Sequence, residues 1–508
     1  MAIEQLVLVG GGIAGCSAAL EAAKLGLRVT LIDEHPQSLS AMSLDSPYFY
    51  GARLAPVLSD QSLIGDRVLG SNDMLLECLE AGVEILTGTC IWGSYRAGAN
   101  SVNMKTPQLG LADADRSWMM EYDHLILAPG SRDLVLSFPG WQLPGVLGVN
   151  GAMTLLNRYQ ALSGSRMVIL GTGNVALGAA RVALDKGVQI AAIVDVVPEV
   201  RGDPDLAADL VRSGVAIILS HTVERILGER EVQAIRVIEV DRSLNPIEDN
   251  AREIPCDTVC MAFGVVPNVE LPSVTGCRLV FDAARGGWVP ALDGRMRTNL
   301  PSVYVIGDAA GVSEKMHLDP GIAADQGRRA AQTVAIHEGL LKGDGDYTSS
   351  GHRPASSPSD AASTLSSASE WLRSLVAAGG TDVIVCQCED VTRRELLDIS
   401  PPKYLGAGNQ RACGGLSGLS PTGRSNQDLI KRLTRVGMGH CQGKRCRDQT
   451  AMLLANAAGI DISMVVPGSY RAPVRPLPLS VMRAGEETEE MRQTWPTWFH
   501  PLDQGSQK

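Results

Sequence analysis

Four cysteines in the last quarter of the chain have the types and the spacing of metal or cluster ligands. Cys386 and Cys388 form a C-x-C pair in VCQCEDVT, and Cys441 and Cys446 form a C-x4-C pair in GMGHCQGKRC. Paired thiolates at such spacing suit a soft, all-cysteine ligand set, which would hold either an iron–sulfur cluster or zinc. The elements that surround these pairs, and the rest of the chain, favour the redox cluster.

A glycine-rich turn near the N-terminus has the pattern of a dinucleotide site. Residues 5–10 predict a buried parallel strand, and VGGGIAG opens a helix directly after it. In this pattern the first glycine allows a tight turn, the second lets the backbone approach a pyrophosphate, and the third lets the helix pack on the strand. After the second strand, Asp33 or its neighbour Glu34 is expected to accept hydrogen bonds from ribose hydroxyls. The predicted loop residues are Gly10, Gly12, Ile13, Ala14 and Gly15.

A second strand–turn–helix unit begins at Met167 with MVILGTGNVALGAA. Gly171 and Gly173 would cradle a second nucleotide, and Asp195, at the end of the next strand, would hold a ribose 2′-hydroxyl. NAD is the first ligand to consider here. The alternatives are another adenine nucleotide at this site, or a unit that only packs against the rest of the chain, because the GxGxxA pattern is permissive.

Three further segments resemble, in the correct order, the motifs of pyridine-nucleotide-disulfide-reductase-like flavoproteins. DHLILAPGSR at 123–132 is similar to their first crossover strand, and MAFGVVPN at 261–268 to the second. TNLPSVYVIGDAAG at 298–311 is similar to the motif whose aspartate binds the ribitol of FAD. The resemblance covers roughly residues 1–340 and implies FAD contacts at Gly130, Gly307 and Asp308.

The redox disulfide of those flavoproteins has no counterpart here. Cys16, Cys78 and Cys90 form no CxxC or C-x4-C pair beside the expected flavin, so electrons are expected to leave FAD by another route. His317, in MHLDPG, is the best candidate for a general base, although a structural histidine is the commoner interpretation.

The segments that carry the two cysteine pairs resemble a small cluster-binding module. CQCEDVTRRELLD and NQDLIKRLTRVGMGHCQGKRCRDQTAMLLA are similar to bacterioferritin-associated ferredoxin. The resemblance implies that Cys386, Cys388, Cys441 and Cys446 bind one 2Fe–2S cluster, and structural zinc is the alternative. Residues 399–424 are interpreted as an insertion, and Cys413 within it as a spare thiol.

Together these segments predict an α/β fold, in which a two-dinucleotide-binding-domain flavoprotein of the disulfide-reductase type precedes a ferredoxin-like 2Fe–2S domain. Gly, Ser, Ala and Pro dominate residues 343–369, which favours a linker. The proline-rich tail from Pro467 is expected to lie as a strap on the body or on a partner chain, because Trp495, Trp498 and Phe499 would be costly to expose. The predicted ranges are an FAD domain at 1–145 and 272–342, a second Rossmann domain at 146–271, a linker at 343–380, a cluster domain at 381–460 and a tail at 461–508.

A flavin domain fused to such a module resembles the alpha-type electron-transfer subunit of heteromeric flavin-dependent amine dehydrogenases. Opine oxidase, hydrogen cyanide synthase and D-hydroxyproline or proline dehydrogenase are members. The resemblance implies an oxidoreductase complex that oxidises a secondary amine or amino acid, such as an opine, proline or a glycine-like substrate. The implied partners are an amino-acid-oxidase-like flavin subunit, with which an FMN would be shared, and a small 2Fe–2S ferredoxin-like subunit. A quinone is the implied electron acceptor.

Composition narrows the other choices. A net charge of −11 argues against a nucleic-acid partner, and no apolar run reaches the ~18–20 residues that span a bilayer. Clustered cysteines fit a reducing cytoplasm better than a disulfide framework, with peripheral attachment at the inner membrane as an alternative. Two other functions stay open, namely a self-contained NADH-dependent ferredoxin-type reductase and a non-catalytic scaffold.

Overall fold

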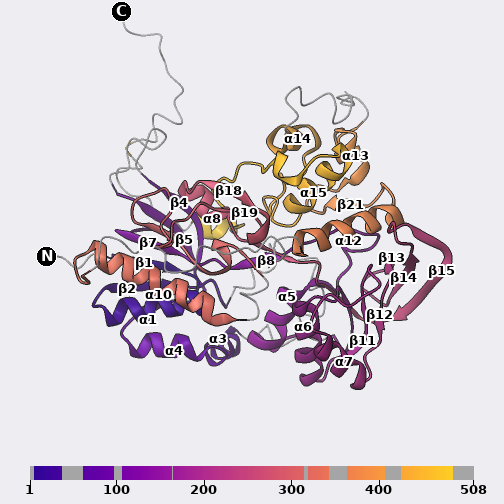
Figure 1. Cartoon of the computed structure of the whole chain (residues 1–508). Helices are drawn as coiled ribbons and strands as arrows, with labels where there is room; N and C mark the ends of the chain where they lie inside the picture. The colour runs from indigo at the N-terminus through magenta and orange to yellow at the C-terminus, as the bar shows by residue number, and fades with distance from the viewer. Residues whose placement is uncertain are drawn as a thin grey trace, which may run out of the picture.

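Two parallel five-stranded sheets organise the computed structural model, one at the left of Figure 1 (β1, β2, β7) and one at its lower right (β11, β12). The structure describes residues 5–36, 61–96, 106–162, 164–313, 319–342, 363–406, 425–483 and 493. The first sheet has the order β20-β7-β1-β2-β3, with strands Val303–Val305, His124–Leu127, Gln5–Val9, Arg28–Ile32 and Glu84–Leu86. The second has the order β12-β11-β10-β16-β9, with strands Ile217–Ile218, Gln189–Val194, Arg166–Leu170, Thr258–Met261 and Val146–Gly148. The predicted pair of Rossmann-type units is confirmed.

Small residues let helices pack closely beside the first sheet. Helices α1 (Ile13–Lys24) and α10 (Pro320–His337) run side by side, as Figure 1 shows. A Cβ atom on Gly327 of α10 would collide with the carbonyl oxygen of Ala14 in α1. Strand β1 beside α1 is apolar after Gln5, with Leu6 and Leu8 fully buried, as parallel strands covered on both faces usually are.

Further elements complete the two Rossmann units. Antiparallel sheets flank them, with β4 (Cys90–Tyr95), β5 (Gln108–Ala112) and β6 (Ser117–Glu121) on the first and β13 (His221–Leu227), β14 (Ala234–Val240) and β15 (Pro246–Pro255) on the second. The smaller elements are α3 (Gln61–Gly70), α4 (Asp73–Glu80), α5 (Val149–Met153), the π-helix η3 (Thr154–Arg158), α6 (Asn174–Asp185), α7 (Pro204–Arg212), α8 (Glu270–Thr275), β18 (Leu279–Asp282), β19 (Gly287–Pro290) and the 3-10 helix η5 (Gly307–Ala310). Among the described helices, none is both long and apolar enough to cross a membrane.

The chain passes between the two Rossmann units through a pair of short strands. Strand β8 (Ser131–Asp133) leaves the first unit, β17 (Val265–Pro267) returns from the second, and the two pair antiparallel. They contain the two segments that the sequence predicted as crossover strands. Residues 130–141, which include β8, are called the crossover segment below.

Helix α12 (Ser363–Gly379) corrects the predicted linker. The sequence predicted a linker through residue 380, whereas this part forms a helix with Trp371, Leu372 and Leu375 in the core. In Figure 1, α12 lies between the second Rossmann unit and the cysteine-bearing domain, and it contacts both β13 and α15 (Arg447–Ala458). The first part of the predicted linker, residues 343–362, falls outside the described residues.

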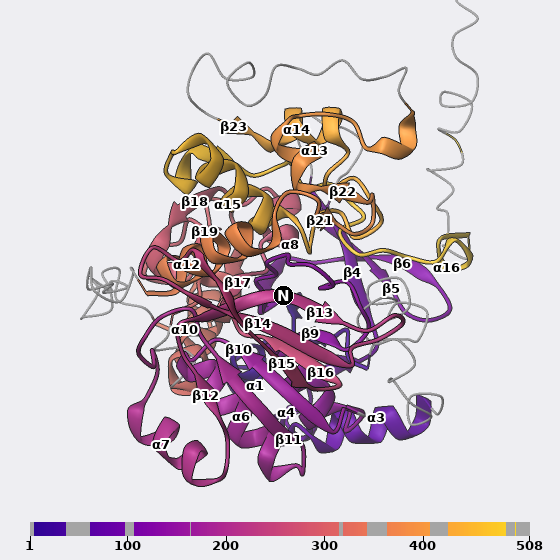
Figure 2. The same ribbon diagram turned by 90° about the vertical axis from the view of Figure 1, so that its right-hand side faces the viewer.

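The cysteine-bearing domain is small and lies directly on the rest of the molecule, as Figure 2 shows at the top. Thr392 and Glu395 form a capping box that begins its helix α13. The domain also includes part of the predicted insertion, of which residues 407–424 lie outside the described ranges. Its elements are β21 (Ile384–Cys386), β22 (Val391–Thr392), α13 (Arg393–Leu397), the 3-10 helix η6 (Lys403–Leu405), β23 (Ser425–Asn426), α14 (Gln427–Thr434) and α15.

Buried side chains bind this domain to the crossover segment. The indole N–H of Trp141 donates to the carbonyl of Ile384 at 2.7 Å. Gln449 accepts from the Ser137 N–H and donates to the Val385 carbonyl, both at 3.0 Å. These contacts use no cysteine, so the domain is positioned independently of any ligand on its thiols.

Arg393 adds a third attachment. Its buried guanidinium donates to the carbonyls of Leu375 at 3.1 Å, Gly380 at 2.9 Å and Ser137. Burial lowers the pKa of this arginine to about 10. One side chain therefore joins α12, the cysteine-bearing domain and the crossover segment.

The tail continues from this domain across the first Rossmann unit. After the 3-10 helix η9 (Ile462–Met464), β24 (Val465–Val466) pairs with β23, and residues 467–475 then form an extended C-terminal strap before α16 (Leu479–Arg483). The Arg447 guanidinium stacks on the Tyr470 ring at 3.6 Å, and the Val474 N–H donates to the Trp92 carbonyl at 2.7 Å. This part of the predicted strap lies on the body of the chain; Trp495, Trp498 and Phe499 lie outside the described residues.

Candidate functional site

A cavity of about 780 Å³ opens at the carboxyl edge of the first sheet. Its volume lies within the roughly 300–1,000 Å³ that cofactor and ligand sites usually have. The cavity brings together several residues predicted from sequence, namely Gly10, Gly12, Asp33, Glu34, Gly130 and Asp308. Ile13, Ala14, Gly15 and Gly307 do not line it; they form or support the loop beside it.

The three loop glycines have different physical roles. Gly10 has a φ of +101°, and a Cβ there would collide with the Ala128 carbonyl. A Cβ on Gly15 would collide with the Gly10 carbonyl, so these two glycines are required by the fold itself. Gly12 has ordinary dihedrals, caps α1 and would meet nothing within 4 Å. A side chain at Gly12 would therefore extend into open space at the helix N-terminus, where a pyrophosphate would bind.

Asp33 and Glu34 occupy different positions at the cavity. Asp33 is buried and its carboxylate accepts from the Gly11 N–H at 2.5 Å and the His35 N–H at 2.7 Å. Glu34 lies at the rim and forms an ion pair of 2.6 Å with Arg475 of the C-terminal strap. Asp33 thus holds the loop, and Glu34 is the acid whose side chain remains only partly covered.

The predicted ribitol end is built from two segments that are far apart in the sequence. Ser131 Oγ donates to Asp308 Oδ2 at 2.7 Å, which joins the crossover segment to η5. Gly307 has a φ of +64° and its N–H donates to Gln326 at 2.8 Å, so α10 orients this turn. His317, the candidate base, lies outside the described residues.

The strap supplies two walls of this cavity that the sequence analysis did not predict. Val474 and Arg475 both line it, and only the prolines of PVRPLPL suggested an extended segment. Deleting residues 467–508 should therefore weaken FAD retention about tenfold or more, whereas deleting residues 484–508 should leave it unchanged. Flavin content after gel filtration measures the difference. Equal retention in both truncations would contradict a role for the strap at the cavity.

The four predicted cysteine ligands lie together in two close pairs. The Cys386 thiol hydrogen-bonds with Cys446, and the Cys388 thiol with Cys441. The Gly437 N–H also donates to Cys386 Sγ at 3.4 Å. Three of the four cysteines are buried and Cys388 is partly exposed. His440 Nε2 lies 3.7 Å from Cys388 Sγ.

The surroundings lower the thiol pKa of one cysteine in each close pair and raise that of the other. Accepting a hydrogen bond from Cys388 lowers the pKa of Cys441 to about 5, together with the Arg445 and Gly443 N–H groups and the Arg445 charge and against the opposing effect of burial. A hydrogen bond from Cys446 likewise lowers the pKa of Cys386. Thiolates are the form of cysteine that binds metal, so the donor set fits a cluster or a soft metal ion.

The second glycine loop has the same backbone geometry as the first. Gly171 has a φ of +120° and its N–H donates to the Val194 carbonyl at 2.7 Å, as the Gly10 N–H donates to Ile32 at 2.8 Å. Gly173 caps α6 and its Cβ position is open. The cavity in front of this loop measures only about 130 Å³, below the usual range for a nucleotide-sized ligand.

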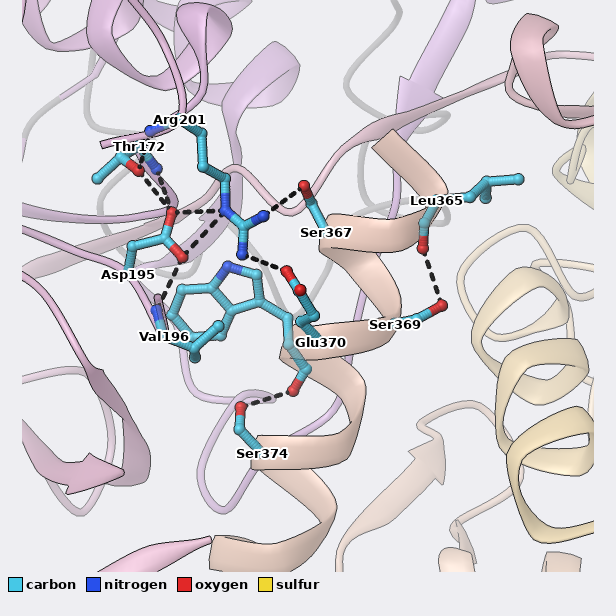
Figure 3. A network of polar contacts seen from close by, with 10 residues as sticks. Thr172, Asp195, Val196, Arg201, Leu365, Ser367, Ser369, Glu370 and Ser374 are labelled. Carbon is cyan, nitrogen blue, oxygen red and sulfur yellow. Dashed lines mark hydrogen bonds and ion pairs between the residues drawn. The ribbon is translucent and has the colours of Figure 1, made fainter. Parts of the chain in front are cut away.

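Helix α12 lines this second cavity, and Figure 3 shows the polar contacts that join the helix to the Rossmann unit. Arg201 lies between the Rossmann unit and the helix, and its guanidinium donates to Ser367 at 2.8 Å and pairs with Glu370 at 2.6 Å. Ser367 and Trp371 of α12 line the cavity. The apolar residues Trp371, Leu372, Leu375 and Val376, at helical spacing, were the sequence signal for this element.

Asp195, the predicted ribose ligand, lines this cavity. It is fully buried, and its carboxylate accepts from the N–H and hydroxyl of Thr172 at 2.8 and 2.7 Å and from the Val196 N–H at 2.7 Å. It also pairs with Arg201 at 3.2 Å. This carboxylate therefore already has partners within the chain, and the cavity in front of it is smaller than a nucleotide-sized ligand usually occupies.

Comparison with known proteins agrees with this architecture. The family model described as pyridine nucleotide-disulphide oxidoreductase matches residues 4–339, more than half of the chain. The chain belongs to that family. Membership makes it an oxidoreductase and implies a bound FAD. A second model, the sarcosine oxidase A3 domain, matches residues 421–486.

Relatives of similar length match nearly the whole chain of this family member. The A subunit of opine oxidase from Agrobacterium tumefaciens is 25% identical over 501 residues, covering 94% of this chain and 90% of its own. Hydrogen cyanide synthase subunit HcnB of Pseudomonas aeruginosa is 25% identical and covers 94% and 98%. The crystal structure of L-proline dehydrogenase from P. horikoshii superimposes with a TM-score of 0.59 at 18% identity, covering 94% of this chain and 79% of that one. The resemblance to subunits of amine-oxidising complexes, and the two-Rossmann fold, are confirmed.

Proposed function

We propose that this chain is the FAD- and 2Fe–2S-containing electron-transfer subunit of a heteromeric dehydrogenase for a secondary amine or amino acid. The observation that carries the proposal is the direct docking of the two-pair thiol domain on the wall of the 780 Å³ cavity. Relatives named as subunits of opine oxidase and hydrogen cyanide synthase support the partner and the substrate class. Substrate oxidation would occur on the partner flavin subunit, with a shared FMN between them.

The arrangement of the thiols supports a 2Fe–2S cluster over zinc. A tetrahedral zinc ion needs four ligand atoms in one tight group, whereas two bridged irons need two pairs of thiolates. Among the described residues, three or more ligand atoms lie within 4.8 Å of one another at His124, His337 and Glu338. The four cysteine thiols do not form such a tight group. We therefore assign Cys386 and Cys446 to one iron and Cys388 and Cys441 to the other.

The cysteines beside the flavin loop support a cluster as the exit route for electrons. Cys16 and Cys78 are fully buried behind the loop and line no wall of the cavity. Its hydrogen bond with Cys78, and then burial, raise the pKa of Cys16, which disfavours the reactive thiolate. The redox disulfide of other family members is thus not replaced by this pair.

The small second site argues against the NADH-dependent reductase. Its cavity of about 130 Å³ is narrowed by Arg201, Ser367 and Trp371. An adenine nucleotide could bind there only if α12 moved. The scaffold alternative makes a different prediction, because a scaffold needs no FAD in the larger cavity.

The test separates this chain from its complex. The isolated chain should not reduce a dye when secondary amines, opines or NADH are added, because substrate oxidation takes place on another subunit. Co-expression with an amino-acid-oxidase-like partner should produce amine-dependent dye reduction at least about a hundredfold above the isolated chain.

A matched variant tests the role of α12 in the same assay. Glu370→Gln removes the ion pair to Arg201 and should still give no bleaching of the flavin by NADH, since Trp371 remains in place. Rapid bleaching of the isolated wild-type chain by NADH, without amine activity after co-expression, would decide for the reductase. Purified chain with a full cluster and no flavin would decide for the scaffold.

A further inference from the structure

Lys444 belongs to two sites at once. It lies in the loop between Cys441 and Cys446, and it is the residue of this loop that lines the 780 Å³ cavity. Arg132 and Glu270 line the same cavity. Arg132 donates a hydrogen bond to the Lys444 carbonyl and forms an ion pair with Glu270. No other residue between the two cysteines reaches this cavity among the residues described.

Arg132 fixes the loop against the cavity wall. Its Nε donates to the Lys444 carbonyl at 3.2 Å, and its Nη2 pairs with Asp448 of α15 at 2.9 Å. On its other side, Nη1 pairs with Glu270 at 2.8 Å. Arg132 directly precedes Asp133 and follows Ser131, the residue bound to Asp308, so two residues of the crossover segment connect the ribitol end to the cysteine loop.

The charges around this contact are concentrated and shielded from water. Burial opposes the charge of Arg132, but Glu270 and Asp448 raise its pKa. Burial also opposes the charge of Glu270, but the positive charges of Arg132, Arg447 and Lys444 outweigh it and hold the pKa of Glu270 below its ordinary value. Because screening is weak in such surroundings, a single positive charge here acts over a longer distance than at the surface.

We propose that Lys444 is a positioning residue shared by both cofactors: its carbonyl holds the cysteine loop on the flavin wall, and its ammonium group stabilises the added negative charge of whichever cofactor is reduced. This inference rests on the function proposed above and adds a coupling between its two redox sites. Loss of the charge would make reduction of both sites less favourable, whereas a charge on the loop but outside the cavity would affect the cluster alone.

Arg445 provides the matched control. It is the next residue of the same loop, its Nη1 donates to Gln387 at 3.3 Å, and it does not line the cavity. The experiment is a spectroelectrochemical titration of the full chain with both cofactors, comparing Lys444→Gln with Arg445→Gln. We expect Lys444→Gln to lower the midpoint potentials of flavin and cluster, and Arg445→Gln to lower that of the cluster only.

Two further variants keep the test decisive if the glutamine variant loads poorly. Lys444→Met retains the long side chain without its charge and should reproduce both shifts. Lys444→Arg retains the charge and should keep both potentials close to wild type, which a purely structural role would not predict.

The outcomes distinguish this inference from the proposed function. A wild-type chain without FAD, or without a 2Fe–2S cluster, would overturn the proposed function before any variant is compared. If the wild-type chain contains both cofactors, and the flavin potentials of Lys444→Gln and Lys444→Met equal that of Arg445→Gln, the role of Lys444 alone would be overturned.

Discussion

Replacing Cys441 by serine should remove the iron from the purified chain. The Cys441 thiol is buried and its pKa is lowered to about 5, whereas a serine hydroxyl stays protonated and is a poor ligand for iron. Anaerobically prepared wild-type protein should contain about two irons and two sulfides per chain and show charge-transfer absorption that bleaches on reduction. In Cys441→Ser, iron, sulfide and this absorption should fall to near zero.

The flavin should remain in the same variant. Trp141, Gln449 and Arg393 hold the domain on the crossover segment without using a thiol, so the cavity wall keeps its shape. Cys90→Ser, outside the cysteine loops, is the control and should keep both cofactors. Stoichiometric zinc without iron in the wild-type chain would refute the cluster assignment.

Replacing Gly12 by valine should abolish FAD binding and leave the fold intact. Gly12 has ordinary backbone dihedrals and no atom within 4 Å of its Cβ position, so valine meets no clash in the chain itself. Its methyl groups would occupy the space in front of the α1 N-terminus, where the pyrophosphate must approach the backbone. Flavin per chain should fall more than about tenfold, measured by absorption after gel filtration, with unchanged circular dichroism.

Gly173→Val is the matched control for this variant. Gly173 caps α6 with similar dihedrals and an equally open Cβ position, but it belongs to the second loop. This variant should retain a full complement of FAD. A loss of flavin from Gly173→Val with retention in Gly12→Val would mean that the two loops have been assigned the wrong way round.

The sequence predicted the parts of the site that depend on local backbone constraints. Gly10 and Gly171 must adopt positive φ in turns that close on a neighbouring strand, and such turns leave a recognisable spacing. The two sequence pairs, Cys386 with Cys388 and Cys441 with Cys446, are equally local, although in the structure each thiol bonds to one from the other pair. A short loop positions the two cysteines of each sequence pair, so their spacing can be recognised in the sequence.

The parts that the sequence did not predict depend on contacts between distant segments. The Ser- and Ala-rich start of α12 has no strong helical pattern, and the helix is stabilised by burial of Trp371 and by the bond from Arg201 to Glu370. Asp195 had the position of a ribose ligand, but Arg201, six residues later, takes its carboxylate. The pairing of Arg475 with Glu34 likewise joins the two ends of the chain.

The unequal exposure of the four thiols has a consequence for maturation and damage of the centre. Cys386, Cys441 and Cys446 are buried, while Cys388 is partly exposed beside the exposed His440. Small molecules from solution can reach the centre at this edge. In the proposed cluster, iron and sulfide would therefore be delivered past Cys388, and oxygen or chelators would attack first at the iron assigned to Cys388 and Cys441.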